Sequence, residues 1–174
     1  MSIEDIKNSI RNVPDFPKKG IQFKDITTAI KNPKIYREII DLMAQEFGKK
    51  KIDYVIGIEA RGFILAAALA YKLGCGFVPV RKANKLPAQV LTQKYALEYG
   101  TDSLEIHADS LEKGANVLIV DDLLATGGTA LATAKLVKQL EANIAAFAFI
   151  IELKDLNGAA TLEPYGKVFS LITW

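Results

Sequence analysis

The sequence predicts an α/β protein built on a mostly parallel, twisted sheet that helices flank on both faces. Two apolar runs, Tyr54–Ile58 and residues 117–120, have strand length and lack the alternation of a half-exposed sheet. Segments with helical apolar spacing follow both runs, as in a parallel sheet with crossover helices. The chain has 174 residues and 50% of them are hydrophobic, so we expect one domain over residues 1–174.

The first 33 residues predict a short helix and a loop. Ser2 and Asp5 form a capping pair at the start of a helix whose apolar residues recur at helical spacing: Ile3, Ile6 and Ile10. A proline-rich loop follows over residues 14–20. The pair Asn32-Pro33 is a favourable start for a longer helix, whose apolar stripe ends near Gly48.

From Tyr54 onward the pattern predicts alternating strands and helices. Helices are expected over residues 62–73 and from about residue 128 to residue 141. The expected strands cover residues 54–58, 77–80, 117–120 and 147–151. Ligands of open α/β sheets bind beyond the carboxyl ends of the strands, so the loops after Ile58, Val80 and Val120 should face one crevice.

The segment of about residues 81–110 interrupts this alternation. Two runs with strand character, residues 89–98 and 103–107, flank a turn signal at residues 99–102. We therefore expect an inserted β flap, in which Tyr95 and Tyr99 serve for packing.

Charge, cysteine content and hydropathy exclude several classes of protein. The 22 Lys and Arg against 20 Asp and Glu leave a net charge of +2, too small to mark a dedicated nucleic-acid binder. Cys75 is the only cysteine, which fits a reducing compartment. Residues 1–11 do not resemble a secretory signal, and the longest apolar stretch, residues 62–71, is too short to span a bilayer. We expect a cytoplasmic protein with no nucleic-acid or membrane partner.

The strongest functional signal is an apolar strand that runs into two acids and then a glycine-rich turn opening a helix. The turn comprises Ala125, Thr126, Gly127, Gly128 and Thr129. Glycines let the backbone approach a ligand, and the free N–H groups of a helix start attract phosphate. The turn lacks the lysine of a nucleoside-triphosphate loop, so a phosphate monoester fits better. The adjacent carboxylates of Asp121 and Asp122 suit the vicinal hydroxyls of a ribose. Acidic capping of an ordinary helix is the competing explanation.

Two other loops at the same edge carry cations. Arg61 follows the first strand, where its fork suits a pyrophosphate; a surface ion pair with Glu59 is the alternative. Arg81, Lys82 and Lys85 form a basic run, which by composition fits a solvated loop equally well. His107, the sole histidine, has no neighbours at metal-ligand spacing and is predicted to be structural.

The segment of residues 121–129 resembles the phosphoribosyl-pyrophosphate signature of the type I phosphoribosyltransferases, in the form of their adenine-using members. Five more segments agree in order: residues 14–17 (PDFP), 23–26 (FKDI), 59–63 (EARGF), 81–87 (RKANKLP) and 97–100 (LEYG). The resemblance spans nearly the whole chain. It implies that family's fold, with a small N-terminal hood of about residues 1–33 for base recognition. The core of about residues 34–174 then carries the flap.

The resemblance implies an enzyme of purine salvage. It would transfer the 5-phosphoribosyl group from phosphoribosyl pyrophosphate to adenine, giving AMP and pyrophosphate. Mg²⁺ would be carried by the substrate's phosphates and not by a protein cage. A homodimer is implied, with the first helix and the basic loop as interface candidates. Two alternatives stay open: a phosphoribosyltransferase for another purine, and a regulator that senses phosphoribosyl pyrophosphate, which should carry a basic face or recognition helix.

The resemblance also implies roles for the charged residues. Arg61, Lys82 and Lys85 would bind the pyrophosphate, and Asp121 and Asp122 the ribose. The catalytic residues would be Arg61, on the leaving group, and Glu98, which would take the proton of the purine imidazole ring. Glu98 taken alone reads as an exposed residue at a strand end.

Adenine would be bound at Ile21, Phe23 and Lys24, largely by backbone groups, with Phe23 stacked on the ring. A strand edge matches the acceptor and amino donor of adenine, whereas hypoxanthine reverses both, at a cost of roughly 1–3 kcal/mol for each unpaired group. An ordinary core position is the competing explanation for Phe23. Asp25 is expected to order this loop by hydrogen bonds without a catalytic role.

Overall fold

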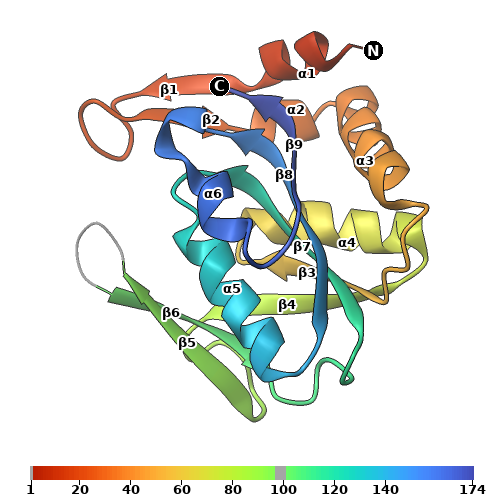
Figure 1. Ribbon diagram of the computed structural model, residues 1–174. Coiled ribbons are helices and arrows are strands. Elements are labelled where there is room, and N and C mark those ends of the chain that lie inside the picture. Colours follow the sequence, from red (N-terminus) through yellow and green to blue (C-terminus); the bar gives the residue numbers. More distant parts are fainter. Residues whose placement is uncertain (1, 97–100) are drawn as a thin grey trace.

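The computed structural model describes residues 2–96 and 101–174 (Figure 1). Its helices are α1 (Ile3–Ser9), α2 (Thr27–Ile30), α3 (Pro33–Phe47), α4 (Arg61–Leu73), α5 (Gly128–Gln139), α6 (Gly158–Leu162) and the 3-10 turn η1 (Lys154–Leu156). Its strands are β1 (Arg11–Pro14), β2 (Gln22–Asp25), β3 (Tyr54–Ile58), β4 (Gly76–Lys82), β5 (Val90–Ala96), β6 (Thr101–His107), β7 (Asn116–Leu124), β8 (Asn143–Glu152) and β9 (Val168–Thr173).

The described strands form one large sheet and one small sheet. The large sheet has seven strands in the order β5-β6-β4-β3-β7-β8-β9, and β1 pairs with β2 in a separate antiparallel hairpin. From β4 to β9 the neighbours run parallel. The strand β6 runs antiparallel to both β4 and β5. The predicted flap is therefore an antiparallel extension of a parallel sheet.

Helices cover both faces of the parallel strands, as the continuous apolar runs predict. Figure 1 shows α5 crossing one face while α3 and α4 lie behind the other. Within β3, Val55 packs in the core layer that contains α3 and α4, and its neighbour Ile56 packs in the layer that contains α5. Both side chains are fully buried. The expected fold class, a mostly parallel sheet between helices, is confirmed.

The predicted helix starts are also confirmed. The Ser2 hydroxyl accepts from Asp5 N–H and the Asp5 carboxylate accepts from Ser2 N–H, which completes a capping box on α1. Asn32 caps α3 through its side-chain oxygen, and Pro33 occupies the first turn. In the described part of the chain, no helix is long and apolar enough to cross a membrane.

Several strand limits differ from the prediction. The strand β7 continues to Leu124 instead of ending at Val120, so Asp121 and Asp122 lie inside it. The reason is that β8 still pairs with β7 there, whereas the pairing with β3 stops at Val120. The strand β6 already begins at Thr101, inside the predicted turn. Part of that turn and of the predicted strand 89–98, residues 97–100, lies outside the described residues.

The β1–β2 hairpin is a feature that the sequence did not predict. Each strand has only four residues, too few for a clear period-2 pattern, and the expected loop 14–20 is the connection between them. The hairpin is tied to the main body at its base, because Ile10 before it and Ile26 after it are buried in the core layer of α3 and α4. The hairpin itself stands at the carboxyl-end side of the main sheet (Figure 1).

Candidate active site

A cavity of about 310 Å³ lies at the carboxyl ends of β3, β4 and β7. Residues from all three predicted loops line it, so the crevice expected from the sequence is present. Its lining comprises Glu59, Ala60, Arg61, Lys82, Tyr95, Leu104, Asp121, Asp122 and Thr129.

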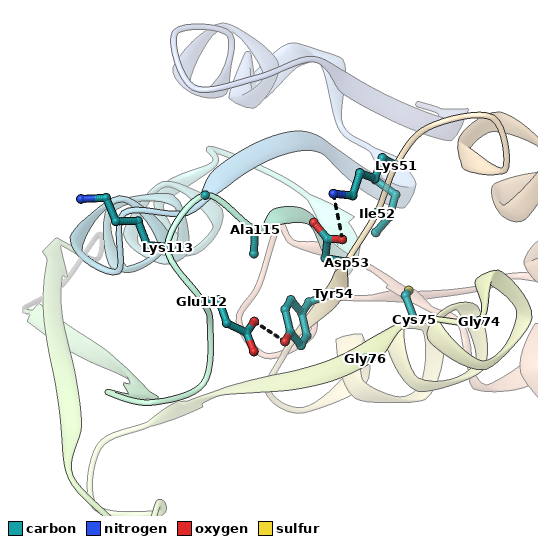
Figure 2. A pocket seen from close by; sticks show the side chains of 11 residues that line it. Lys51, Ile52, Asp53, Tyr54, Gly74, Cys75, Gly76, Glu112, Lys113 and Ala115 are labelled. Atoms are coloured by element: carbon teal, nitrogen blue, oxygen red, sulfur yellow. Dashed lines mark hydrogen bonds and ion pairs between the residues drawn. The ribbon is translucent and has the colours of Figure 1, made fainter.

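A larger cavity, of about 630 Å³, lies at the opposite end of the sheet. Figure 2 shows it between the segments that lead into β3, β4 and β7. Its polar side chains bind one another: the Tyr54 hydroxyl donates to Glu112, and Lys51 lies 3.8 Å from Asp53. Open α/β sheets bind ligands at the carboxyl ends of their strands, so we assign the site to the smaller cavity.

Arg61 and Asp122 make the central ion pair of this cavity. The Arg61 Nε lies 2.8 Å from Asp122 Oδ2, and Asp122 is only 3% exposed. Arg61 starts α4, and the next residue must be small: a Cβ on Gly62 would lie 2.9 Å from both Asp121 Oδ1 and Val120 O. Gly62 thus lets α4 approach β7 closely enough for the pair to form. The alternative ion pair of Arg61 with Glu59 is not the one observed.

The two aspartates compete for one guanidinium. Burial raises the pKa of Asp121 well above its ordinary value, and the neighbouring charge of Asp122 raises it further. Burial also raises the pKa of Asp122, although Arg61 opposes that shift. Asp122 N–H donates to Asp121 Oδ1 at 2.9 Å, while Asp122 Oδ2 is buried without an aligned hydrogen bond. This oxygen is the one that lies 2.8 Å from Arg61 Nε, so the guanidinium neutralises the buried carboxylate through an ion pair.

The glycine-rich turn forms an uncapped helix start. Gly127 adopts φ of 86° directly before α5, and no side chain caps that helix. The first N–H groups of a helix have no partner inside it, and of the turn residues 125–129 Thr129 is the one that lines the cavity. The turn rests on Gly158, where a Cβ would lie 2.2 Å from Ala125 O. The structure therefore has a glycine turn that opens directly into an uncapped helix at residues 125–129.

Glu59 holds the basic run, a contact that the sequence interpretation missed. Its carboxylate lies 2.7 Å from Lys85 Nζ and 3.3 Å from Arg81 Nε, and it accepts from Lys82 N–H at 3.0 Å. Burial raises the pKa of Glu59, but these hydrogen bonds outweigh it and bring the pKa down to about 2. Lys82 itself lies 3.2 Å from Asp102. The position of Glu59 directly after the buried strand β3 is the feature of the sequence that could have indicated this contact.

The hairpin brings Phe23 to the same arginine. The Arg61 guanidinium lies 4.9 Å from the centroid of the Phe23 ring, and Phe16 packs edge-on against Phe23 at 5.1 Å. Phe23 is half-buried and belongs to neither core layer, which disfavours the ordinary core position. The Lys24 side chain lies on the other face of β2, where it donates to Asn12. Ile21 precedes β2 and is 41% exposed.

The remaining predicted residues have different outcomes. Glu98 lies outside the described residues, as does Tyr99. Tyr95 packs against the core layer of α5 and also lines the cavity. Asp25 accepts from Thr27 N–H at 2.9 Å and pairs with Arg11 at 2.6 Å, which fits the ordering role expected for it. Among the described residues, no three His, Cys, Asp or Glu side chains group as a metal site.

With this geometry in place, the comparisons with known proteins identify the class. The model of the family described as phosphoribosyl transferase domain matches residues 27–174. The chain therefore belongs to the phosphoribosyl transferase domain family.

Individual relatives narrow this to one branch of the family. The adenine phosphoribosyltransferase of Chlorobium luteolum is 57% identical, over 95% of this chain and 96% of its own. The crystal structure of that enzyme from Thermoanaerobacter pseudethanolicus has a TM-score of 0.97 at 51% identity, covering 99% of this chain and 100% of its own. The Saccharomyces cerevisiae enzyme, crystallised with adenine and an imino-altritol bisphosphate, has a TM-score of 0.92 at 42% identity, with 98% of both chains covered. These relatives are all adenine phosphoribosyltransferases, and this chain falls in their branch.

The close contact beneath the phosphate cradle predicts that Gly158→Ala is destabilising. The added Cβ meets the main-chain oxygen of Ala125, which has to move, and we expect a loss of about 1–3 kcal/mol in the free energy of unfolding. Urea unfolding checks this. Gly128→Ala is the matched control, because its Cβ would meet nothing closer than 3.9 Å. Equal stabilities for the two variants would contradict the proposed contact.

The Glu59 cluster predicts a pH-dependent stability difference. The folded-state pKa of about 2 is below the ordinary 4.5, so the ionised carboxylate stabilises the fold above about pH 4.5 and this stabilisation is lost as the pH falls toward 2. Glu59→Gln should lower the free energy of unfolding by about 2 kcal/mol at pH 7. The gap to the wild type should narrow below pH 4.5 in urea titrations. The exposed Glu163→Gln should show neither effect; a gap for Glu59→Gln that does not change with pH would refute the charge-based explanation.

Proposed function

We propose that the protein transfers the 5-phosphoribosyl group of phosphoribosyl pyrophosphate to adenine, giving AMP and pyrophosphate, and so acts in purine salvage. The observation that carries this proposal is the double contact of Arg61. It reaches the buried acid pair through Asp122 and the base-recognition hairpin through Phe23. A sugar phosphate on one side and a flat base on the other are the two substrates that such a site joins.

The 5-phosphate is assigned to the cradle of residues 125–129, Ala125, Thr126, Gly127, Gly128 and Thr129. The open N–H groups at the start of α5 and its positive dipole end favour a phosphate there. The ribose hydroxyls are assigned to Asp121 and Asp122, which lie on the strand leading into this cradle. The position of both carboxylates on the cavity wall supports that assignment.

The pyrophosphate is assigned to Arg61, Lys82 and Lys85. In the described structure, Lys85 is held by Glu59 and Lys82 by Asp102. Phosphate oxygens of the substrate would compete with these carboxylates for the ammonium groups, because charge-assisted pairs with phosphate are of similar strength. Without substrate, Lys82 and Lys85 are thus ion-paired with carboxylates of the protein, and the pyrophosphate would take the place of these carboxylates.

Mg²⁺ fits this site as a companion of the substrate. Substrate phosphates and water would supply most of its oxygen ligands, and the carboxylates of Asp121 and Asp122, which line the cavity, would contact it only indirectly. When bound, the ion would neutralise charge on the pyrophosphate. The residues of the chain hold the ribose hydroxyls beside it.

The chemical step is a substitution at the anomeric carbon of the ribose. The bond from that carbon to the pyrophosphate oxygen breaks, and a bond to the imidazole nitrogen N9 of adenine forms. The proton on N9 passes to Glu98, our candidate base, while Arg61 stabilises the charge on the departing pyrophosphate. The match of residues 97–100 to the family segment supports the role of Glu98.

Adenine is assigned to the hairpin, between Ile21 and Lys24. Stacking on the base is assigned to Phe23, whose ring lies beside Arg61, a residue of the cavity wall. Recognition by backbone groups of β2 would distinguish the amino group of adenine from the oxygen of hypoxanthine. Residues of about 1–33 would thus form the base-recognition hood of one domain whose core is about residues 34–174.

We place the protein in the cytoplasm as a homodimer. The single free cysteine, Cys75, fits a reducing compartment. An exposed apolar surface on α4 and β4 supports a dimer: Ile64 is 42% exposed, Tyr71 90% and Phe77 38%. The first helix presents less apolar surface to a second chain than the sequence predicts, because Ile6 and Ile10 are buried in this chain's own core.

The activity is tested by incubating the purified protein with phosphoribosyl pyrophosphate, Mg²⁺ and one base at a time. AMP from adenine, with no product from hypoxanthine, guanine or xanthine, is the expected result. Product from another base alone would overturn the assignment of the base site. A protein that binds phosphoribosyl pyrophosphate but turns over none of the bases would be a ligand-sensing regulator.

The role of Glu98 predicts a selective loss of turnover. Glu98→Gln keeps the shape of the side chain but removes the proton acceptor, so kcat should fall by about 10²-fold or more while both KM values change little. Steady-state kinetics with adenine decide this. Glu163→Gln, at an exposed position, is the control and should retain most of kcat. An unchanged kcat for Glu98→Gln would remove it from the mechanism.

The dimer predicts that a charge on the α4 surface separates the chains. Ile64→Asp should shift the mass measured by light scattering from two chains toward one, because burying a lone carboxylate in an apolar interface is costly. Leu156→Asp, at a position 48% exposed on η1, is the control and should stay dimeric. A wild-type protein with the mass of one chain would contradict the proposal.

A further inference from the structure

Trp174 lies between two lysines at the base-recognition hairpin. Lys24 Nζ, on β2, lies 4.7 Å from the centroid of the Trp174 ring, and Lys7 Nζ, on α1, lies 4.9 Å from it. Lys7 Nζ also donates to the carbonyl of Thr173 at 3.2 Å. These contacts join segments more than a hundred residues apart, and Figure 1 shows the end of β9 beside β1 and α1.

Trp174 is firmly attached to the main sheet. The main-chain N–H of Trp174 donates to Glu152 O at 2.9 Å, and the main-chain carbonyl of Trp174 accepts from Lys154 N–H at 2.9 Å. Glu152 ends β8, the neighbour of the strand that carries Asp121 and Asp122. The main chain of Trp174 therefore has a fixed position relative to the acid pair, and its ring contacts Lys24 and Lys7 from there.

The hairpin has two faces, and each makes a different contact with the main body. On one face, Phe23 lies against the guanidinium of Arg61. On the other face, Lys24 lies over Trp174 and donates to Asn12 Oδ1 at 3.1 Å, while Asn12 Nδ2 donates to Gln22 Oε1 at 2.6 Å. The β1–β2 sheet makes no strand pairing with the main sheet among the described residues. The orientation of the hairpin relative to the main sheet therefore depends on side-chain contacts such as Phe23 with Arg61 and Lys24 with Trp174.

We propose that Trp174 is a positioning residue for adenine: through Lys24 it holds β2, and thereby Phe23 and the backbone edge, at the distance from the ribose site that adenine requires. This inference rests on the proposed function. Trp174 touches no substrate in this account. Its side chain acts on the base site, because the ring contacts Lys24 of β2, whereas the phosphate cradle and the acid pair are built from β7 and α5.

Kinetics of three variants test this. Trp174→Leu keeps an apolar side chain but loses the aromatic face, and we expect KM for adenine to rise about threefold to tenfold, with KM for phosphoribosyl pyrophosphate and kcat within about twofold of the wild type. Trp174→Phe retains a ring and should recover most of the affinity. Lys50→Met is the control, since it removes a comparable lysine–ring contact, 5.3 Å from Phe47, at the far end of α3.

A purely structural role gives a different result. Global destabilisation would lower the active fraction, so kcat would fall and both KM values would stay the same; that result overturns the proposal. Equal rises in both KM values, or no rescue by Trp174→Phe, overturn it too. Wild-type protein that makes no AMP would instead refute the proposed function.

The contact itself can be measured independently of catalysis. Trp174 is the only tryptophan of the chain, so emission excited at the red edge of the absorption band reports on it alone. Lys24→Met removes a charge next to the indole, and we expect a shift of the emission maximum and a changed iodide quenching constant. Lys50→Met should leave both unchanged. Emission unaffected by Lys24→Met would mean that the contact is not made, and would overturn the proposal whatever the activity of the protein.

Discussion

The contact of Arg61 with Asp122 is the interaction on which the rest of the site depends. It connects the first residue of α4 with the carboxyl end of β7 over 2.8 Å, in a place where Asp122 is almost fully buried. A charge buried so deeply is stable only with a partner. The same guanidinium faces Phe23 of the hairpin, so one side chain connects the proposed sugar-phosphate site with the proposed base site.

Ion pairs within the protein neutralise the charges of the site when no substrate is bound. Two aspartates share one arginine, and burial raises the pKa of both. The lysines that would bind the pyrophosphate are meanwhile held by Glu59 and Asp102. In the proposed reaction, phosphate oxygens of the substrate would replace Glu59 and Asp102 as the partners of these lysines, so that little charge would be left unpaired.

The sequence predicted the parallel core because its signals are local. Apolar runs such as Tyr54–Ile58 and the capping residues Ser2 and Asn32 act over a few residues. It did not predict the hairpin, whose strands are too short for a pattern, nor the extension of β7 to Leu124, which depends on pairing with β8. The residue types of the site were found by their place after strands. Their partners were not, because contacts such as Glu59 with Lys85 join loops 26 residues apart.

The most direct test of this account is a double-mutant cycle on the central pair, with affinity for phosphoribosyl pyrophosphate measured by calorimetry. The variants are Arg61→Gln, Asp122→Asn and the two combined. If the pair acts as one unit, the losses in binding free energy are non-additive by about 1 kcal/mol or more. Losses that add to within about 0.4 kcal/mol would show that the two residues act independently, and would contradict the central place given to their contact.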